Sequence, residues 1–311
     1  MMTEKMERKG NNLKPEGRGK PDIRMIALDL DGTALDRKMR VTERTVRAME
    51  EAARRGVQVV ISTGRTYHTL PEQLREIRGL DYAVTSNGAI INRLKTGEVL
   101  YRNCLPREAV EQAAEIFRRE GVGAGADGTD MNSGSGGQIS IEIFTEGDAF
   151  MERRELEDIA ENGSSYRNAF YVSTTRRPAD GIVDFMLAHR QRIENICLNF
   201  PDISRRPVWR ERLSRLPGVT LTTSLPHNME IGGKNTSKGE ALRFLMKELG
   251  LSAKQLMACG DSPNDASMIR LAGLGVVMGN SSEEMKEKAD FVTDSNESDG
   301  VAKAIERFVL V

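Results

Sequence analysis

The feature that most constrains the fold is an alternation of short β-rich runs with helical patterns. After a first apolar run, Val46, Met49 and Ala53 recur at helical spacing, and the segment 57–62, VQVVIS, then has the composition of a buried strand. Such alternation is typical of βαβ units that build a largely parallel sheet. We therefore expect an α/β fold.

This alternation is interrupted in the middle of the chain, which predicts two domains. The turn dipeptide Asn87-Gly88 is followed by a hairpin pattern and then by mixed helices and alternating strands, and the βαβ rhythm returns at Met229. We expect a core domain formed by 23–88 and 229–311, an inserted α+β domain at 89–228, and a disordered polar tail at 1–22.

Composition excludes several classes of function. The 45 Lys and Arg residues nearly balance the 46 Asp and Glu residues, so bulk charge favours neither nucleic acid nor an anionic membrane as partner. The three cysteines form no CxxC pair and the three histidines share no metal-ligand spacing, so any bound metal should prefer oxygen ligands. No apolar run is long enough to cross a membrane, and we expect a cytoplasmic protein.

The first buried strand ends in two acids, Asp29 and Asp31, within the stretch MIALDLDGT. Residues two apart in a strand point the same way, and at the carboxyl end of a parallel strand they face the crevice where open α/β sheets bind ligands. Two such carboxylates repel unless a cation or a proton lies between them, and Mg²⁺ is the natural cation. The alternative is an Asp-Gly turn in which one carboxylate caps the backbone.

A second acidic cluster, CGDSPND, follows the apolar run near residue 258. Asp261 and Asp265 lie four residues apart at an expected junction of strand and helix, and Asn264 adds an amide. The alternative is a turn whose side chains cap the next helix. Because two expected core strands each end in a carboxylate cluster, we predict one acidic site at this edge of the sheet.

Groups suited to an anion accompany these acids. The stretch STGR supplies the Thr63 hydroxyl and the Gly64 backbone N–H after the second strand, and Lys238 lies near the start of an expected helix, where amide donors favour anions. Taken alone, Lys238 could equally be an ordinary solvated lysine. The GxGxxG pattern at 123–128 does not lie between a strand and a helix, so we interpret it as a flexible loop.

The ordered motifs DLDGT, STGR, SKGEAL and GDSPND resemble those of the haloacid dehalogenase superfamily of phosphohydrolases. The place of the insertion, the stretch SNGA at 86–89 and the C-terminal segment are similar to the Cof-type branch with a subfamily IIB (C2B) cap. The resemblance implies a Rossmannoid parallel-sheet core with an inserted α+β cap. The chain departs from it at Ser281, where the branch usually has Ala, and in the Gly/Ser-rich segment 121–137.

The resemblance also implies a mechanism. Asp29 would attack phosphorus to give an aspartyl-phosphate, and Asp31 would act as general acid and then as general base. The implied Mg²⁺ ligands and supporting carboxylates are Asp29, Asp31 through its backbone carbonyl, Asp261 and Asp265. The implied phosphate-binding residues are Leu30 through its backbone, Thr63, Gly64, Lys238 and Asn264.

The cap of such enzymes selects the substrate, which we expect to be a small-molecule phosphate ester. Asn87, His227 and Asn228 are candidate substrate contacts, although His227 could equally be a partly buried residue of a returning strand. The stretch from SLPHNMEI to SKGEAL resembles enzymes that dephosphorylate ribitylaminouracil phosphate, while sugar phosphates, pyridoxal phosphate and flavin mononucleotide stay open. The alternatives to a phosphatase are a phosphomutase and a non-catalytic phosphate-ester sensor.

Overall fold

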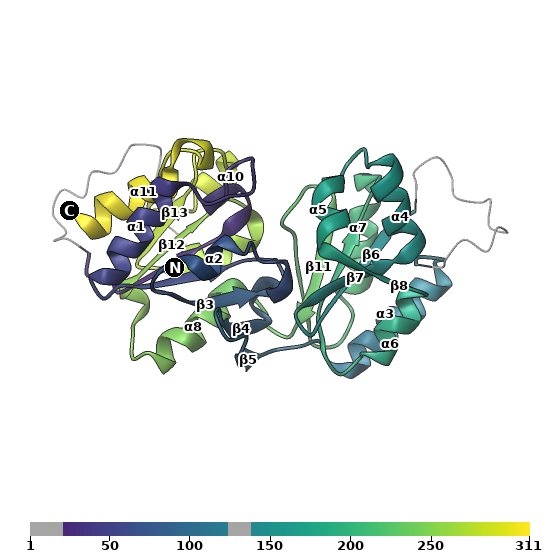
Figure 1. Ribbon diagram of the computed structural model, residues 1–311. Helices are drawn as coiled ribbons and strands as arrows, with labels where there is room; N and C mark the ends of the chain where they lie inside the picture. Colours follow the sequence, from purple (N-terminus) through teal and green to yellow (C-terminus); the bar gives the residue numbers. More distant parts are fainter. Residues whose placement is uncertain (1–20, 124–137) are drawn as a thin grey trace, which may run out of the picture.

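The computed structural model describes residues 21–123 and 138–311, which form two parts, each with its own sheet (Figure 1). The core holds an eight-stranded sheet of order β14-β13-β12-β1-β2-β3-β4-β5, and the cap holds a six-stranded sheet of order β10-β11-β9-β6-β7-β8. The expected α/β core with an inserted α+β cap is therefore present. The GxGxxG pattern and most of the Gly/Ser-rich segment lie outside the described residues, as does nearly all of the polar tail.

Six strands of the core sheet run parallel, and two antiparallel strands extend one edge. The parallel strands are β1 (Met25–Leu28), β2 (Gln58–Ser62), β3 (Leu80–Thr85), β12 (Leu256–Gly260), β13 (Leu274–Val277) and β14 (Phe291–Val292). The antiparallel strands are β4 (Ile90–Arg93) and β5 (Val99–Arg102).

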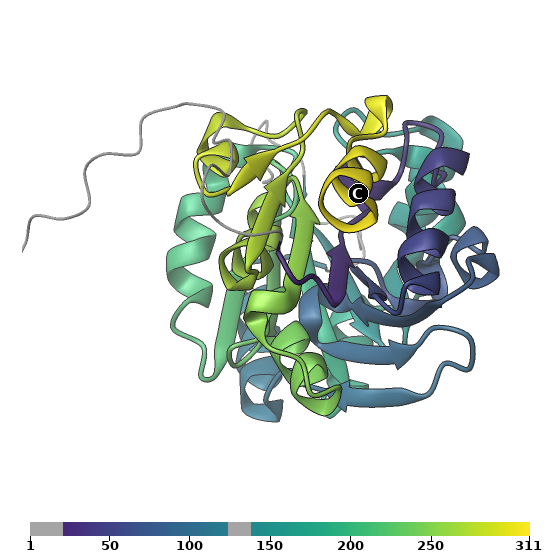
Figure 2. The same cartoon turned by 90° about the vertical axis from the view of Figure 1, so that its left-hand side faces the viewer.

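Helices cover both faces of the core sheet, because its strands are apolar on both sides (Figure 2). Ile26 and Leu28 pack in the cluster shared with α1 and α11, whereas Met25 and Ala27 pack in the cluster shared with α8 and α9. The core helices are α1 (Glu43–Arg54), α2 (Gln73–Glu76), α8 (Lys238–Glu248), α9 (Ala266–Leu271), α10 (Glu283–Lys286) and α11 (Gly300–Ile305).

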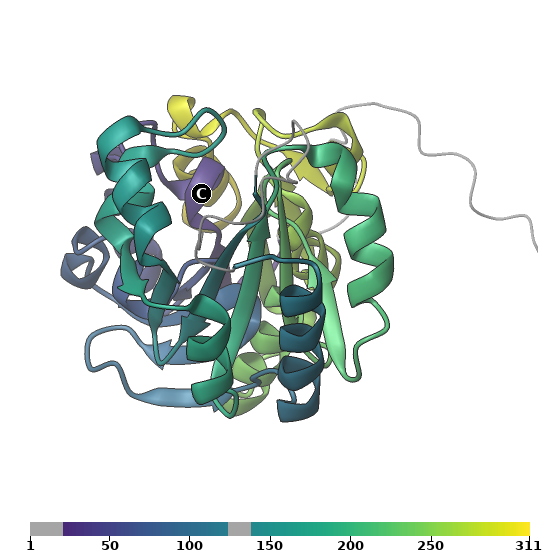
Figure 3. The ribbon, with the colours of Figure 1, turned by 90° about the vertical axis from the view of Figure 1, so that its right-hand side faces the viewer.

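Helices α3, α6 and α7 cover the face of the cap sheet that lies away from the core, as the view from the cap side shows (Figure 3), whereas α4 and α5 pack against Met151 on the other face. Its strands are β6 (Ser140–Thr145), β7 (Asp148–Glu152), β8 (Arg176–Ala179), β9 (Ile193–Asn199), β10 (Val219–Thr222) and β11 (Asn228–Gly233). Its helices are α3 (Arg107–Arg119), α4 (Arg153–Asn162), α5 (Ala169–Thr175), α6 (Ile182–Ala188) and α7 (Arg206–Leu213).

Strand pairing places the boundaries of the cap differently from the sequence analysis, which assigned 89–228 to it. The hairpin of β4 and β5 extends the core sheet by pairing with β3, and β11 pairs with β9 and β10 in the cap sheet. The cap therefore begins after Arg102 and its sheet ends at Gly233. Periodicity identified these strands but could not tell which sheet each would join.

Within the described part of the chain, the structure contains no helix that is long and apolar enough to cross a bilayer.

Candidate active site

The carboxyl ends of four neighbouring parallel strands meet on one side of the core sheet, and we name this place the catalytic edge. β1 leads into Asp29, β2 into Thr63, β3 into Asn87 through a short turn, and β12 into Asp261. Because parallel strands end on the same side, residues far apart in sequence converge at this edge. The two acidic motifs are brought together as the sequence predicted.

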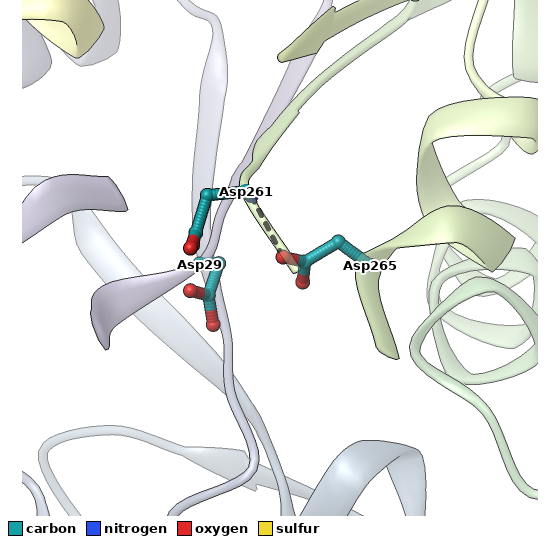
Figure 4. Close-up of side chains that lie close together, drawn as sticks. All are labelled: Asp29, Asp261 and Asp265. Carbon is teal, nitrogen blue, oxygen red and sulfur yellow. Dashed lines mark hydrogen bonds between the residues drawn. The ribbon is translucent and has the colours of Figure 1, made fainter. Parts of the chain in front are cut away.

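The centre of this edge is a buried acidic cluster of Asp29, Asp261 and Asp265 (Figure 4). One carboxylate oxygen from each lies within 4.8 Å of the others. Lys238, at the start of α8, reaches into the cluster, and its Nζ donates to Oδ1 of Asp29 and to Oδ1 of Asp265, each at 2.6 Å. Lys238 is fully buried, so it is not a solvated lysine.

The charges of this cluster are not balanced by protein groups. Burial raises the pKa of Asp29 well above its usual value, and repulsion from Asp265 and Asp261 adds to the rise, against the attraction of Lys238. Burial and repulsion from Asp265 likewise raise the pKa of Asp261 to about 7. Clustered carboxylate oxygens that are short of positive charge fit a hard divalent cation.

Hydrogen bonds from nearby turns fix the carboxylates of Asp261 and Asp265. Thr33 donates to Oδ1 of Asp261 at 2.9 Å, and Asp265 accepts from the backbone N–H of Asp261 and of Ser262. The Ser281 hydroxyl donates to the Asp261 carbonyl, which gives this departure from the family pattern a contact that Ala would lack. These hydrogen bonds hold Asp261 and do not involve Oδ2, its other carboxylate oxygen.

The predicted phosphate-binding residues lie beside the cluster. Thr63 is buried, and Gly64 lies where an added Cβ would be 3.1 Å from Oδ1 of Asn87. That oxygen accepts from Nδ2 of Asn264 at 2.9 Å, so the turns after β2, β3 and β12 are linked. Leu30, in the turn after β1, has a fully buried side chain, which leaves its backbone as the part that could meet a ligand.

Asp31 is the most exposed acid of the site and is held by an arginine. Arg65 donates Nε to Oδ2 of Asp31 at 2.8 Å and Nη2 to Oδ1 at 2.6 Å. The same guanidinium lies 4.6 Å from the ring centroid of Tyr171, a residue of α5 in the cap. Core and cap thus meet at the side chain that orients Asp31.

Above these residues is a pocket of about 370 Å³ between core and cap. His227 lines it and contacts the ring of Tyr166 edge-on, and burial lowers its pKa. Asn228 also lines it, but its Oδ1 accepts from the backbone N–H groups of Ser224 and Leu225. The amide oxygen of Asn228 is therefore occupied in holding its own loop.

Several side chains at the pocket were not predicted. The sequence analysis quoted Arg65 inside STGR without a role and did not identify four cap residues that line the pocket, which are Glu142, Tyr171, Arg176 and Glu230. A signal existed for the two glutamates, because each is an acid directly between two apolar residues, in the stretches ISIEIF and NMEI. Tyr171 and Arg176 carried no such signal, because neither residue interrupts an apolar run or belongs to a recognisable motif.

The fold and this site define the class of protein. The chain belongs to the haloacid dehalogenase-like hydrolases, whose family model matches residues 26–305. This finding confirms the resemblance, the fold class and the predicted hydrolytic enzyme.

Three individual comparisons agree. The chain is 28% identical over 289 residues to 5-amino-6-(5-phospho-D-ribitylamino)uracil phosphatase YcsE of Bacillus subtilis, a match that covers 93% of this chain and 97% of that protein. A solved haloacid dehalogenase-like hydrolase from B. subtilis is 26% identical with a TM-score of 0.74, covering 91% and 99% of the two chains. A solved HAD subclass IIB sugar phosphatase shares the fold, with 21% identity, a TM-score of 0.74 and coverage of 93% and 100%.

Proposed function

We propose that this chain is a Mg²⁺-dependent phosphomonoesterase that hydrolyses a small phosphorylated metabolite through an aspartyl-phosphate. The substrate class is a sugar phosphate or a ribitylaminouracil phosphate, in line with the names of its relatives. The observation that carries the proposal is the buried Asp29, which lines a pocket, accepts a hydrogen bond from Lys238 and lies close to two further carboxylates.

The acidic cluster supplies the residues that would hold the metal. Asp29, Asp261 and the backbone carbonyl of Asp31 would be direct ligands, with Asp265 as a supporting carboxylate. Bound Mg²⁺ would neutralise charge on the phosphoryl oxygens. Lys238 already balances part of the charge of Asp29 and Asp265, which keeps these groups in place whether or not the ion is bound.

The residues of the chain account for both halves of the reaction. A carboxylate oxygen of Asp29 attacks phosphorus and the bond to the leaving alcohol breaks, while Asp31 gives that alcohol a proton. Asp31 then takes a proton from water, which attacks phosphorus and releases inorganic phosphate and free Asp29. Arg65 binds both oxygens of Asp31, so one of these contacts must be released before Asp31 can carry the proton that it gives to the alcohol.

The remaining phosphoryl oxygens would be bound by the groups around Asp29. The Thr63 hydroxyl, the backbone N–H groups of Gly64 and Leu30, the Asn264 amide and Lys238 are the donors. Phosphoryl transfer depends mainly on such positioning and charge stabilisation.

Phosphate release from a panel of esters tests this function. The panel contains sugar, nucleotide, flavin, pyridoxal and ribitylaminouracil phosphates, each with Mg²⁺ and with a chelator, and the variant Asp29→Asn is compared with the exposed-site control Asp81→Asn. We expect release that needs Mg²⁺, survives in the control and falls at least a thousandfold in Asp29→Asn. An isomeric phosphate in place of free phosphate would instead identify a phosphomutase, and binding without turnover would identify a sensor.

A further inference from the structure

The cap sheet turns a polar face toward the catalytic edge. Ile141, Ile143, Ile196 and Leu198 pack under α3, α6 and α7 on the far face (Figure 3). Because side chains alternate along strands, the residues between them point the other way, toward the core. Those that line the pocket from β6, β9 and β11 are Glu142, Phe144, Cys197, Asn199, Asn228 and Glu230.

The charged groups at one side of this face are already paired. Glu142 is 1% exposed and forms ion pairs with both Arg167 and Arg176. Arg167 also lies 3.5 Å from Glu155, and Arg176 lies 4.8 Å from the ring centroid of Tyr171. Since each of these guanidinium groups has a carboxylate partner, this part of the cap is not built to attract a second anionic group on the substrate.

Two other side chains on the same face, both of which line the pocket, have polar atoms without a partner. Among the described residues, Oε2 of Glu230 and Nδ2 of Asn199 are buried and accept or donate no hydrogen bond. The residues are 3% and 4% exposed, and both line the pocket. A buried polar atom left unpaired is costly, so these two atoms indicate what a ligand should bring to them.

These two side chains lie next to each other on the sheet. Asn228 is opposite Asn199 in the antiparallel pair of β11 and β9, and Glu230 is two residues further along β11, so Glu230 and Asn199 are diagonal neighbours. Diagonal neighbours point from the same face, about 7–8 Å apart. One is an acceptor and the other a donor, which is the combination that hydroxyl groups satisfy.

We propose that Glu230 and Asn199 form a hydroxyl-binding subsite that selects esters of polyhydroxylated alcohols, with one substrate hydroxyl donating to Glu230 and another accepting from Asn199. This inference rests on the proposed function. It assigns the choice of leaving group to two named residues of the cap. An ester without hydroxyls would leave both atoms unpaired, which is the situation in which buried polar sites discriminate most strongly.

The test compares esters with and without hydroxyl groups. Phosphate release with Mg²⁺ is measured for sugar and polyol phosphates, for their single-deoxy analogues, and for ethyl phosphate, an ester whose alcohol carries no further hydroxyl. The selectivity ratio is kcat/KM for the best hydroxylated ester divided by kcat/KM for ethyl phosphate. It is measured in the wild type, in Glu230→Gln and Asn199→Asp, which conserve shape, and in the matched control Glu157→Gln on the exposed surface of α4.

We expect Glu230→Gln and Asn199→Asp each to lower the selectivity ratio at least tenfold, and Glu157→Gln to leave it unchanged. In the wild type, kcat/KM for one deoxy analogue should be at least tenfold lower than kcat/KM for its parent ester. For that analogue, Glu230→Gln should lower kcat/KM only a little further. The proposal is overturned if no single-deoxy ester loses tenfold in the wild type, a result that needs no folded variant. It is also overturned if folded variants keep the wild-type ratio. Failure of the wild type to release phosphate from any ester, ethyl phosphate included, would instead refute the proposed phosphatase function.

Discussion

At the scale of single residues, the site combines three carboxylates that repel one another with one ammonium group that pairs with two of them. Asp29, Asp261, Asp265 and Lys238 were all predicted from the order of their motifs, because each follows an expected strand or opens an expected helix. Their burial was not predictable, since a lysine in a first helical turn is usually solvated. Lys238 is buried because two carboxylates reach its ammonium group at 2.6 Å.

Removing the ammonium group should expose how much these carboxylates depend on it. We expect Lys238→Met to lower the free energy of unfolding by about 3–5 kcal/mol without metal, because two buried carboxylates lose their partner. Urea unfolding in the presence of a chelator measures this change. The control is Lys247→Met on the exposed side of the same helix, which should differ from wild type by less than about 0.5 kcal/mol. Equal stability of the two variants would contradict the pairing.

The raised pKa of Asp261 predicts how pH and metal act together. Its pKa rises from 3.8 in the unfolded chain to about 7 in the fold, so the folded protein binds the proton more tightly between these values. Without metal, this group therefore stabilises the fold at low pH and loses that contribution as pH rises toward 7 and above. Mg²⁺ competes with the proton, so it should raise the melting temperature more at pH 8 than at pH 5. Thermal unfolding with Mg²⁺ or a chelator at several pH values checks this, and a metal effect that is larger at pH 5 would contradict it.

At the scale of elements, tight turns after the strands bring the acids together. The turn after β1 depends on Gly32, which has a φ of +78°, a conformation that L side chains rarely adopt. A Cβ at Gly32 would lie 2.6 Å from Oδ2 of Asp261. Because Gly32 has no side chain, the turn after β1 leaves room for the carboxylate of Asp261.

Gly32→Ala should therefore weaken metal binding as well as the fold. We expect the Mg²⁺ concentration for half-maximal activity to rise at least tenfold, because the new methyl group displaces Asp261. The matched control is Gly56→Ala, since Gly56 has a φ of +81° but no atom within 4 Å of an added Cβ. That variant carries the backbone strain alone, so it should lose stability and keep the wild-type Mg²⁺ dependence. A similar Mg²⁺ dependence in both variants would show that contact with Asp261 is unimportant.

Prediction from sequence was better for elements of the core than for those of the cap. The core strands were recognisable because apolar runs buried on both faces, followed by motif residues, leave few alternatives. In the cap, Glu142 and Glu230 lie on the polar face of their strands, and this face points to the core and not to solvent. Alternation distinguishes a polar face from an apolar one, but it could not show that the polar face forms a pocket. The hairpin at 90–102 was recognised as a hairpin but assigned to the wrong domain, since register says nothing about which sheet a strand joins.

At the scale of the whole molecule, core and cap contact each other across the pocket. The ring of Tyr171, in the cap, is in contact with two guanidinium groups, that of Arg65 in the core and that of Arg176 in the cap. Arg65 in turn holds Asp31. This chain of contacts links the cap to the side chain of the proposed general acid and base.

Loss of this ring should open the molecule and slow the reaction. We expect Tyr171→Leu to increase the radius of gyration in small-angle X-ray scattering and to lower kcat/KM at least fivefold, because the cation–π contacts are worth roughly 1 kcal/mol each. The control is Phe170→Leu at the adjacent residue, whose side chain points to solvent and is 75% exposed. If the Phe170 variant opens the molecule as much as the Tyr171 variant, the ring of Tyr171 does not hold the cap.

The two crossings between core and cap lie side by side. Nδ2 of Asn103, in the segment that leads from the core into the cap, donates to the carbonyl of Lys234 in the segment that leads back, and a Cβ at Gly233 would lie 2.5 Å from the carbonyl oxygen of Cys104. An insertion whose ends meet in this way adds almost no loop-closure cost to the domain that carries it. The core can therefore carry a different inserted domain in place of this cap. Specificity can then change during evolution while the core strands that position the site residues stay the same.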